Sequence, residues 1–258
     1  MTSKNKLEEI YPISKKEVTF VNSLKEKKNR QFYKQFCVEG EKLVQLLFDR
    51  KIKIEWLFAT EDWIRENDHF EDINHLRLVN EEQLKKISSL VTPNEVLAVV
   101  NQDIRDEIAI VTENTIVLDN IKDPGNLGTI IRLADWFGIP NIVCSKSTVD
   151  CYNSKVVQAT MGALFNIKID YLDLDMFFQN QILPIYGADV EGTNIYENKL
   201  PSKMILVMGS ESHGISENVH SKIEHFITIP KFQDNPAVES LNVSIATSII
   251  CALQKTNV

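Results

Sequence analysis

The sequence lacks the features of a secreted, membrane-spanning or disulfide-stapled protein. The first thirty residues are rich in Lys and Glu and contain no apolar core of the kind that a signal peptide has. No run approaches the roughly 18 apolar residues of a transmembrane helix. The four cysteines, Cys37, Cys144, Cys151 and Cys251, form no C-x-x-C pair, so a zinc site and a disulfide framework are both disfavoured. We therefore expect a cytoplasmic protein with reduced thiols, no metal and no membrane partner.

Three familiar active-site motifs are also missing. The turn at 125–128 (GNLG) is neither the G-x-G-x-x-G dinucleotide fingerprint nor a phosphate-binding P-loop. The loop at 209–214 (GSESHG) has the wrong spacing for a G-x-S-x-G nucleophile elbow, and His213 beside Ser212 does not by itself supply a positioned base. An oxidoreductase built on the first turn would need an acidic residue about 20 positions on, and the next strand ends without one. A hydrolase and an oxidoreductase are therefore disfavoured.

Charge is distributed unevenly along the 258 residues. Residues 1–53 carry thirteen Lys and Arg against seven Asp and Glu, a net +6, whereas the remainder carries fifteen against twenty-nine, a net −14. A basic end on an acidic body suggests that a polyanion contacts that end. An ordinary solvated helix face would give the same count, and charge alone does not decide between the two.

Short apolar runs alternate with amphipathic segments through most of the chain, which predicts an α/β fold. Composition predicts four parts: a basic helical segment at 1–31, a small α/β domain at 32–101, a charged linker at 102–113 and a second α/β domain at 114–258. At 43% hydrophobic residues, the chain can bury a sizeable core.

Local signals mark the starts of elements in the first part. Ser14 with Glu17, and Asn80 with Gln83, have the spacing of capping boxes. The segment 32–40 (FYKQFCVEG) predicts a strand that leads into a turn.

One β–turn–α–β unit organises the second part. A β-branched strand, Thr115–Leu118, leads into the turn 123–126 (DPGN), and apolar residues recur at helical spacing after Gly128. Such turns lie at the carboxyl ends of parallel strands, where α/β proteins bind ligands. Asn126 could simply cap this helix and Arg132 could simply be solvated, so the unit alone predicts a ligand-binding α/β domain and no more.

Two further polar clusters follow apolar strands. The run 204–208 (MILVM) is typical of a central parallel strand and enters the loop 209–214. Ser240, Asn242 and Ser244 interrupt the start of an otherwise apolar final helix. One cap needs only one of these groups, and the other could face a ligand held at the positive end of the helix.

Together the clusters resemble the three ordered motifs of a known family. They read Asn126-x5-Arg132 after Asp119-Asn120, then LVMGSE at 206–211, then Ile229-Pro230 followed by ESLNVS at 239–244. Residues 114–254 thereby resemble the SpoU (TrmH) family of RNA 2′-O-ribose methyltransferases, in the SPOUT class. The segments 36–40 (FCVEG) and 87–100 are similar to the family's RNA-binding domain, which is related to ribosomal proteins that bind kinked RNA.

The resemblance implies a fold and a cofactor that the patterns alone do not. It implies a parallel sheet threaded into a trefoil knot, a homodimer whose interface completes the site, and S-adenosyl-L-methionine bound in a bent shape. The residues that would contact the cofactor, largely through backbone groups, are Gly209, Ile229 and Leu241. The catalytic residues that would line the RNA and the reaction site are Arg132, Asn126, Glu211, Ser240 and Asn242. The loop 231–239 is longer than in the family and contains no glycine, so we expect its shape to differ.

The implied reaction is attack of a ribose 2′-hydroxyl on the sulfonium methyl group. Arg132 has no acceptor atom and a pKa above ~12, so we expect it to hold a phosphate and stabilise the developing oxyanion rather than act as a base. The resemblance also implies a target, because a separate first domain in that family goes more often with ribosomal RNA, especially of the large subunit, than with transfer RNA. The alternative is an RNA-binding or ribosome-assembly module that has lost catalysis.

Overall fold

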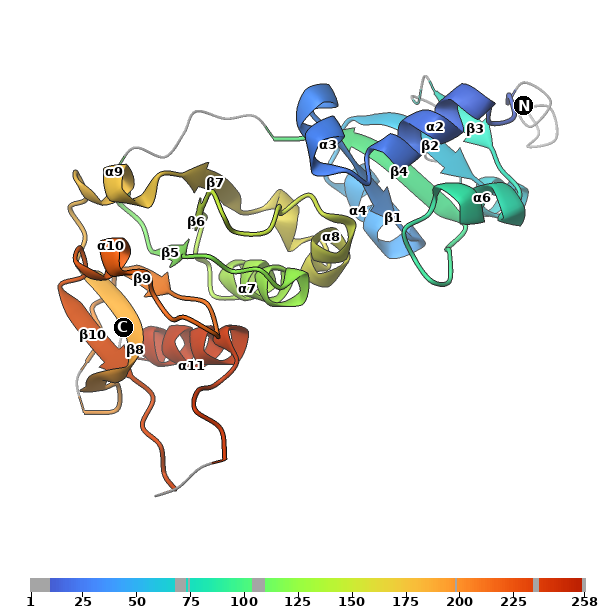
Figure 1. The fold of residues 1–258 in the computed structure, drawn as a ribbon. Helices are drawn as coiled ribbons and strands as arrows, with labels where there is room; N and C mark the ends of the chain where they lie inside the picture. The colour runs from blue at the N-terminus through green and yellow to red at the C-terminus, as the bar shows by residue number, and fades with distance from the viewer. Residues whose placement is uncertain are drawn as a thin grey trace. The chain divides into compact units, whose positions relative to one another are not determined.

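The computed structural model describes residues 10–67, 73, 75–103, 110–197, 199–233 and 237–256. The chain divides into two compact units (Figure 1). Unit 1 comprises Met1–Ile104 with Tyr152–Gln158, and unit 2 comprises Arg105–Cys151 with Ala159–Val258.

Unit 1 contains a four-stranded sheet in the order β1-β4-β2-β3. Strands β2 and β3 are parallel, and the other pairs are antiparallel. The strands are β1 (Gln35–Glu39), β2 (Ile54–Ala59), β3 (Leu76–Leu78) and β4 (Val96–Asn101). The helices are α2 (Lys15–Ser23), α3 (Lys27–Tyr33), α4 (Glu41–Asp49), α5 (Glu61–Glu66) and α6 (Glu81–Ile87). The alternation predicted for this part is confirmed.

Both predicted capping boxes of unit 1 are present. Ser14 accepts from the backbone of Glu17 at the start of α2, and Asn80 pairs reciprocally with Gln83 at the start of α6. Helix α2 is part of the unit 1 core, because Val21 on it is completely buried in the same apolar cluster as the sheet residues of β2 and β4.

The strand predicted to begin at residue 32 begins later, so that prediction is wrong at its start. Helix α3 continues to Tyr33, and β1 starts at Gln35. Arg30 explains the difference: its side chain is buried and donates to the carbonyl oxygens of Leu24 (2.9 Å) and Lys25 (2.7 Å). These bonds hold the short helix against the preceding turn, and they remove Arg30 from the basic surface.

Unit 2 contains a six-stranded, fully parallel sheet in the order β10-β8-β9-β5-β6-β7. Its strands are β5 (Thr115–Leu118), β6 (Asn141–Ser145), β7 (Lys168–Leu172), β8 (Ile185–Asn194), β9 (Ile205–Met208) and β10 (His225–Thr228). Its helices are α7 (Pro124–Trp136), α9 (Leu174–Phe178), α10 (Glu217–His220) and α11 (Val243–Thr256), with a 3₁₀ turn at Ala163–Phe165; α8 (Ser154–Thr160) begins in unit 1 and ends in unit 2. The central strands β5 and β9 are entirely buried, as their apolar sequences predict.

Helix α7 begins at Pro124, before the Gly128 after which the sequence predicted it. Asp123, not Asn126, is its N-cap, and Asp123 Oδ1 accepts from the backbone N–H of Asn126 at 2.8 Å. Pro124 occupies the first helical position, where its fixed φ and missing N–H cost nothing. Capping therefore does not account for the Asn126 side chain.

A buried amide joins distant parts of unit 2. Asn114 Oδ1 accepts from Gln254 Nε2 (2.8 Å) and from the backbone N–H of Met204 (2.9 Å), while Asn114 Nδ2 donates to the Ser202 carbonyl (2.9 Å). These bonds fix α11 relative to the start of β5, and α11 packs against α7 (Figure 1). The parallel α/β fold is confirmed, and the trefoil knot stays a prediction.

Candidate active site

The carboxyl ends of β5 and β9 bring two polar loops together. The strands are paired in register, so Leu118 and Met208 lie opposite each other where both strands end. Asp119, the next residue, is buried and its Oδ2 accepts from the backbone N–H of Ser216 at 2.8 Å. Its carboxylate therefore ties the end of β5 to the loop that follows β9.

Three predicted site residues form one chain of hydrogen bonds. Asn242 Nδ2 donates to Asn126 Oδ1 at 2.9 Å, and Asn126 Nδ2 donates in turn to a carboxylate oxygen of Glu211. The other end of Asn242 caps α11, because its Oδ1 accepts from the backbone N–H of Ser244 at 3.0 Å. The three motifs thus meet through side chains that lie 85 and 116 positions apart.

The other two predicted catalytic residues are placed differently. Ser240 lines the cavity described below but has no hydrogen bond to the Asn126 chain among the described residues. Arg132 is exposed on α7, and in the described part of the chain it makes no hydrogen bond or ion pair. Six residues along a helix place it about 9 Å from Asn126 along the axis and on another face. Within a single copy of the protein, Arg132 therefore lies away from the hydrogen-bonded side chains of the other predicted site residues.

A cavity of about 660 Å³ lies beside the amide chain in unit 2. The three residues predicted to contact a cofactor, Gly209, Ile229 and Leu241, all line it, as does Glu211. Sequence reasoning missed several other residues that line the cavity, among them Asp189, Val190, Tyr196 and Phe232. Asp189 is the last residue of the strand that the sequence predicts over 184–189, and Val190 lies on the continuation of β8 beyond it. No motif marked Tyr196 or Phe232.

Gly209 shapes one wall of this cavity. A Cβ added to it would lie 2.1 Å from the carbonyl carbon of Gly214. Ser210 and Gly214 exchange two backbone hydrogen bonds of 3.0 and 2.8 Å, which close the loop into a tight hairpin. Only glycine permits this approach of backbone to backbone.

The cavity fits S-adenosylmethionine. Its walls are largely aliphatic, which suits a flat base, and ring stacking is available from the Tyr196–Phe232 pair, whose centroids are 6.3 Å apart. Three carboxylates, those of Asp189, Glu211 and Glu239, line it against the single ammonium of Lys231. That excess of negative charge favours a sulfonium cation over an anionic ligand.

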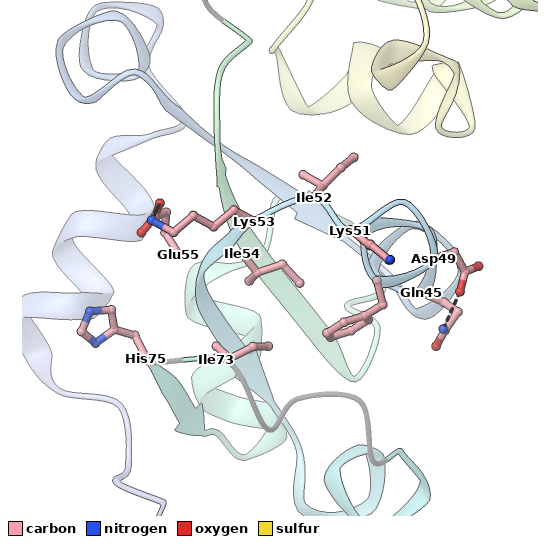
Figure 2. A pocket seen from close by; sticks show the side chains of 10 residues that line it. Gln45, Asp49, Lys51, Ile52, Lys53, Ile54, Glu55, Ile73 and His75 are labelled. Atoms are coloured by element: carbon pink, nitrogen blue, oxygen red, sulfur yellow. Dashed lines mark hydrogen bonds and ion pairs between the residues drawn. The ribbon is translucent and has the colours of Figure 1, made fainter.

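A second cavity, of about 670 Å³, lies in unit 1 between α4 and the beginning of β2 (Figure 2). Lys53 forms an ion pair with Glu55 at 2.8 Å, and Gln45 donates to Asp49 at 3.0 Å. Among the described residues that line it, no nucleophile, base and oxyanion donor are arranged together, so the cavity carries no assigned reaction.

The structure contains one serine–histidine contact of the kind a hydrolase uses, but no catalytic triad among the described residues. Ser212 Oγ lies 2.7 Å from His213 Nδ1, a hydrogen bond that adjacency in sequence did not predict. Both residues are exposed, and no described carboxylate bonds to His213. The oxidoreductase hypothesis is also disfavoured, because the 125–128 turn on which it depends does not line the 660 Å³ cavity. In the described part of the chain, no cluster of three potential metal ligands occurs, and no helix has the length and apolarity to cross a bilayer.

Comparison with known proteins places this geometry in a family. Residues 113–252 match the SpoU rRNA Methylase family, and residues 15–98 match the MRM3-like substrate binding domain. The chain is 25% identical over 228 residues to 23S rRNA (guanosine(2553)-2′-O)-methyltransferase RlmP of Bacillus subtilis, covering 87% of this chain and 90% of that protein. It is 32% identical over 174 residues to the mitochondrial rRNA methyltransferase 3 of Xenopus laevis, covering 63% of this chain and 41% of that one.

Solved structures agree. A TrmH-family protein from Porphyromonas gingivalis superposes with a TM-score of 0.82 at 35% identity, covering 94% of this chain and 98% of that one. An AdoMet-bound rRNA methyltransferase from Sinorhizobium meliloti superposes with a TM-score of 0.81 at 26% identity, covering 96% and 97%. Because the family match spans more than half of the sequence and includes all three motifs, this chain belongs to the SpoU rRNA methylase family.

Proposed function

We propose that this enzyme methylates a ribose 2′-hydroxyl in structured RNA, and that the RNA is ribosomal, from the large subunit, rather than transfer RNA. The observation that carries the proposal is the hydrogen-bonded chain of Glu211, Asn126 and Asn242 beside the cavity lined by Gly209 and Ile229. The names of the relatives support the 2′-O position and the ribosomal target. The match of residues 15–98 to a substrate-binding domain supports RNA contact by the basic amino-terminal side.

S-adenosylmethionine, when bound, supplies an electrophilic methyl group on a positively charged sulfur. The reaction breaks the S–CH₃ bond and forms an O–CH₃ bond, and the proton of the 2′-hydroxyl leaves to solvent or to a nearby acceptor. The protein's task is alignment, which in well-oriented model systems supplies roughly 7–11 kcal/mol of the barrier. Glu211 orients Asn126, which in turn is fixed by Asn242, so the amide chain presents a rigid rim against which a ribose can be placed.

Arg132 acts on the RNA. Its guanidinium holds the phosphate next to the reacting ribose and stabilises negative charge that develops on the 2′ oxygen. We place Ser240 beside the ribose, because it lines the cavity close to the start of α11.

We propose that a homodimer completes the site, because Arg132 stands apart from the amide chain in a single copy. Helices α7 and α11 pack side by side and carry the exposed apolar side chains of Trp136 (84%) and Ile245 (52%), and Leu241, just before α11, is 45% exposed. A second copy that covered these side chains would stabilise the assembly through apolar burial. It could also bring its own Arg132 close to the hydrogen-bonded Asn126 and Asn242 of the first copy.

The target is tested by mapping 2′-O-methyl marks in RNA from cells with and without the gene. We expect one mark in large-subunit RNA to disappear and to return with the wild-type chain. A lost mark confined to transfer RNA would correct the target, and unchanged RNA would refute the activity.

The role of Arg132 is tested by Arg132→Lys, which keeps the charge and loses the planar fork. We expect transfer to fall by about 10²–10³, the effect of losing one oxyanion donor, while S-adenosylmethionine still binds in a calorimetric titration. Near-normal turnover would remove Arg132 from the mechanism. An absence of cofactor binding in the wild-type chain would favour the non-catalytic module.

A further inference from the structure

Phe32, at the end of α3 in unit 1, is exposed far beyond what an apolar aromatic side chain ordinarily shows. It is 80% exposed, and the neighbouring Tyr33 is 45% exposed. The two rings meet edge to face, with centroids 5.0 Å apart and planes at 87°. A perpendicular contact uses only one edge or face of each ring, so most of the Phe32 ring remains open to a ligand.

The two exposed rings stand on a rigid base. Tyr33 contacts Phe20 edge to face at 5.2 Å, and Phe20 packs against the apolar core of unit 1. The helix that carries Phe32 is itself fixed by buried Arg30, which bonds to the carbonyl oxygens of two preceding residues. The ring is therefore held in place rather than carried on a loose terminus, which lowers the entropy lost when a flat ligand stacks on it.

Positive charge surrounds the Phe32–Tyr33 ring pair. Lys28 lies four residues before Phe32, so both share the outward face of α3. The segment 25–34 contains four exposed lysines against one acidic residue, Glu26. An exposed ring in such a setting suits a ligand that is both flat and anionic.

We propose that an unpaired RNA base stacks on Phe32 while lysines of segment 25–34 hold the neighbouring phosphates. Single-stranded nucleic acid is the polyanion that offers free base faces, and base–aromatic stacking beside lysines is how proteins generally bind it. In a nucleic-acid duplex the base faces are buried by stacking, and an acidic protein surface presents no flat rings to stack on Phe32. The inference rests on the proposed RNA substrate and names the part of that RNA that unit 1 recognises.

The test compares two RNA probes on the full chain: a hairpin with an unpaired loop and a blunt duplex of the same composition. We expect Phe32→Ala to weaken binding of the hairpin by about 5- to 150-fold, the fold-change equivalent to the roughly 1–3 kcal/mol of stacking one base, and to leave duplex binding unchanged. Tyr11→Ala is the matched control, because Tyr11 is a 73% exposed aromatic residue of unit 1 that lies away from the Phe32–Tyr33 ring pair. This variant should bind both probes as the wild-type protein does.

A second variant separates charge from stacking. Lys28→Gln should weaken both probes and reduce the salt dependence of binding by a slope of about 0.7–0.9, the value of one phosphate contact. Thermal unfolding of each variant should match wild type because Phe32 and Lys28 are exposed. S-adenosylmethionine titration should match as well, because α3 lies outside unit 2.

Each other outcome has a distinct meaning. If wild-type protein binds hairpin RNA and Phe32→Ala binds it equally well, the stacking site is refuted while the proposed function stands. If Phe32→Ala weakens hairpin and duplex alike, the ring does not read unpaired bases and the inference is also refuted. If wild-type protein binds neither RNA, the proposed function itself fails.

Discussion

Asn242 donates to Asn126 across 116 sequence positions, and the same side chain caps the helix that follows it. The two roles use opposite ends of one amide: Nδ2 reaches Asn126 at 2.9 Å, and Oδ1 accepts from the backbone N–H groups of Ser244 and Ile245 at 3.0 and 3.3 Å. The orientation of the amide is therefore fixed from both sides. This arrangement lets the contribution to stability be separated from the contribution to the reaction.

Asn242→Asp keeps the capping oxygen and removes the donor. We expect its free energy of unfolding to stay close to wild type, because a carboxylate at a helix N-terminus is favourable. Asn242→Ala loses the cap and should be less stable by about 1 kcal/mol. Methyl transfer should fall at least tenfold in both, because Asn126 loses its fixed orientation. Urea unfolding and a transfer assay distinguish these effects, and full activity of Asn242→Asp would separate the amide chain from catalysis.

Gly209 and Gly214 are paired in space but should respond differently to alanine. In Gly209→Ala the new Cβ would meet backbone atoms at 2.1–2.3 Å, so the hairpin must open. We expect a loss of stability of about 3 kcal/mol or more together with weaker S-adenosylmethionine binding.

Gly214→Ala is the matched control, because a Cβ there meets nothing within 4 Å and only the φ of +64° is strained. Its cost should be about 1–2 kcal/mol. Thermal unfolding and cofactor titration measure both variants. Equal effects in the two would mean that the hairpin is not the wall of the cofactor site.

The Tyr196–Phe232 pair should contribute to cofactor affinity. Phe232 comes from the long 231–239 loop, is 88% exposed and still lines the cavity together with Tyr196. An additional ring contact is worth about 0.5–1.5 kcal/mol, so Phe232→Ala should raise the Kd for S-adenosylmethionine about 2- to 12-fold.

Adenosine and methionine, titrated separately, locate the contact. Phe232→Ala should weaken adenosine and leave methionine unaffected, because only the base can stack. Met176→Ala provides the control, since Met176 is a 69% exposed side chain of unit 2 outside the cavity. An unchanged Kd for the cofactor would show that the loop lies away from the bound base.

The thiols should be unreactive in the folded protein. Burial, with a smaller effect of Glu39, raises the pKa of Cys37 to about 12, and burial raises the pKa of Cys251 to about 12. Burial also raises the pKa of Cys144 well above its ordinary value. Because the thiolate is the nucleophile, a thiol reagent at pH 8 should label these three cysteines only after unfolding.

The same shifts predict alkaline destabilisation. Protons held more tightly in the folded state give stability that is complete below the unfolded pKa near 9 and is lost as pH rises toward 12. The free energy of unfolding should therefore fall over that range, and the double variant Cys37→Ala/Cys251→Ala should show a shallower fall. A slope unchanged by both substitutions would place the titrating groups elsewhere.

Periodicity and turn chemistry predicted most of the fold. The β-branched run at Thr115–Leu118 and the apolar run before Gly209 are buried, parallel and adjacent, and this explains why their loops meet. Strand order, however, depends on long-range pairing that a local pattern does not contain. Asp123 and Asn126 both have side chains that can cap a helix, and Pro124, at the first helical position, favours the earlier start that the structure has.

The site was predicted in part. Asn126, Glu211 and Asn242 are polar interruptions next to apolar strands or helices, so the sequence marks them, and they do meet. Asp189, Tyr196 and Phe232 carry no such mark. Asp189 lies at the end of a predicted strand, and Tyr196 and Phe232 lie in loops. In such positions no sequence period distinguishes a residue that lines a cavity from one that faces solvent.

The buried bond between Asn114 and Gln254 bears on how this protein is made. Asn114 receives one of its partners, Gln254, only 140 positions later. During synthesis its set of hydrogen bonds therefore stays incomplete until α11 has left the ribosome. Most of unit 1 is contiguous and can fold while the rest is still being translated. The unit that we propose to contact RNA would then fold before the unit that carries the candidate active site, and premature termination within α11 would leave a nascent product with the first unit folded and the second incomplete.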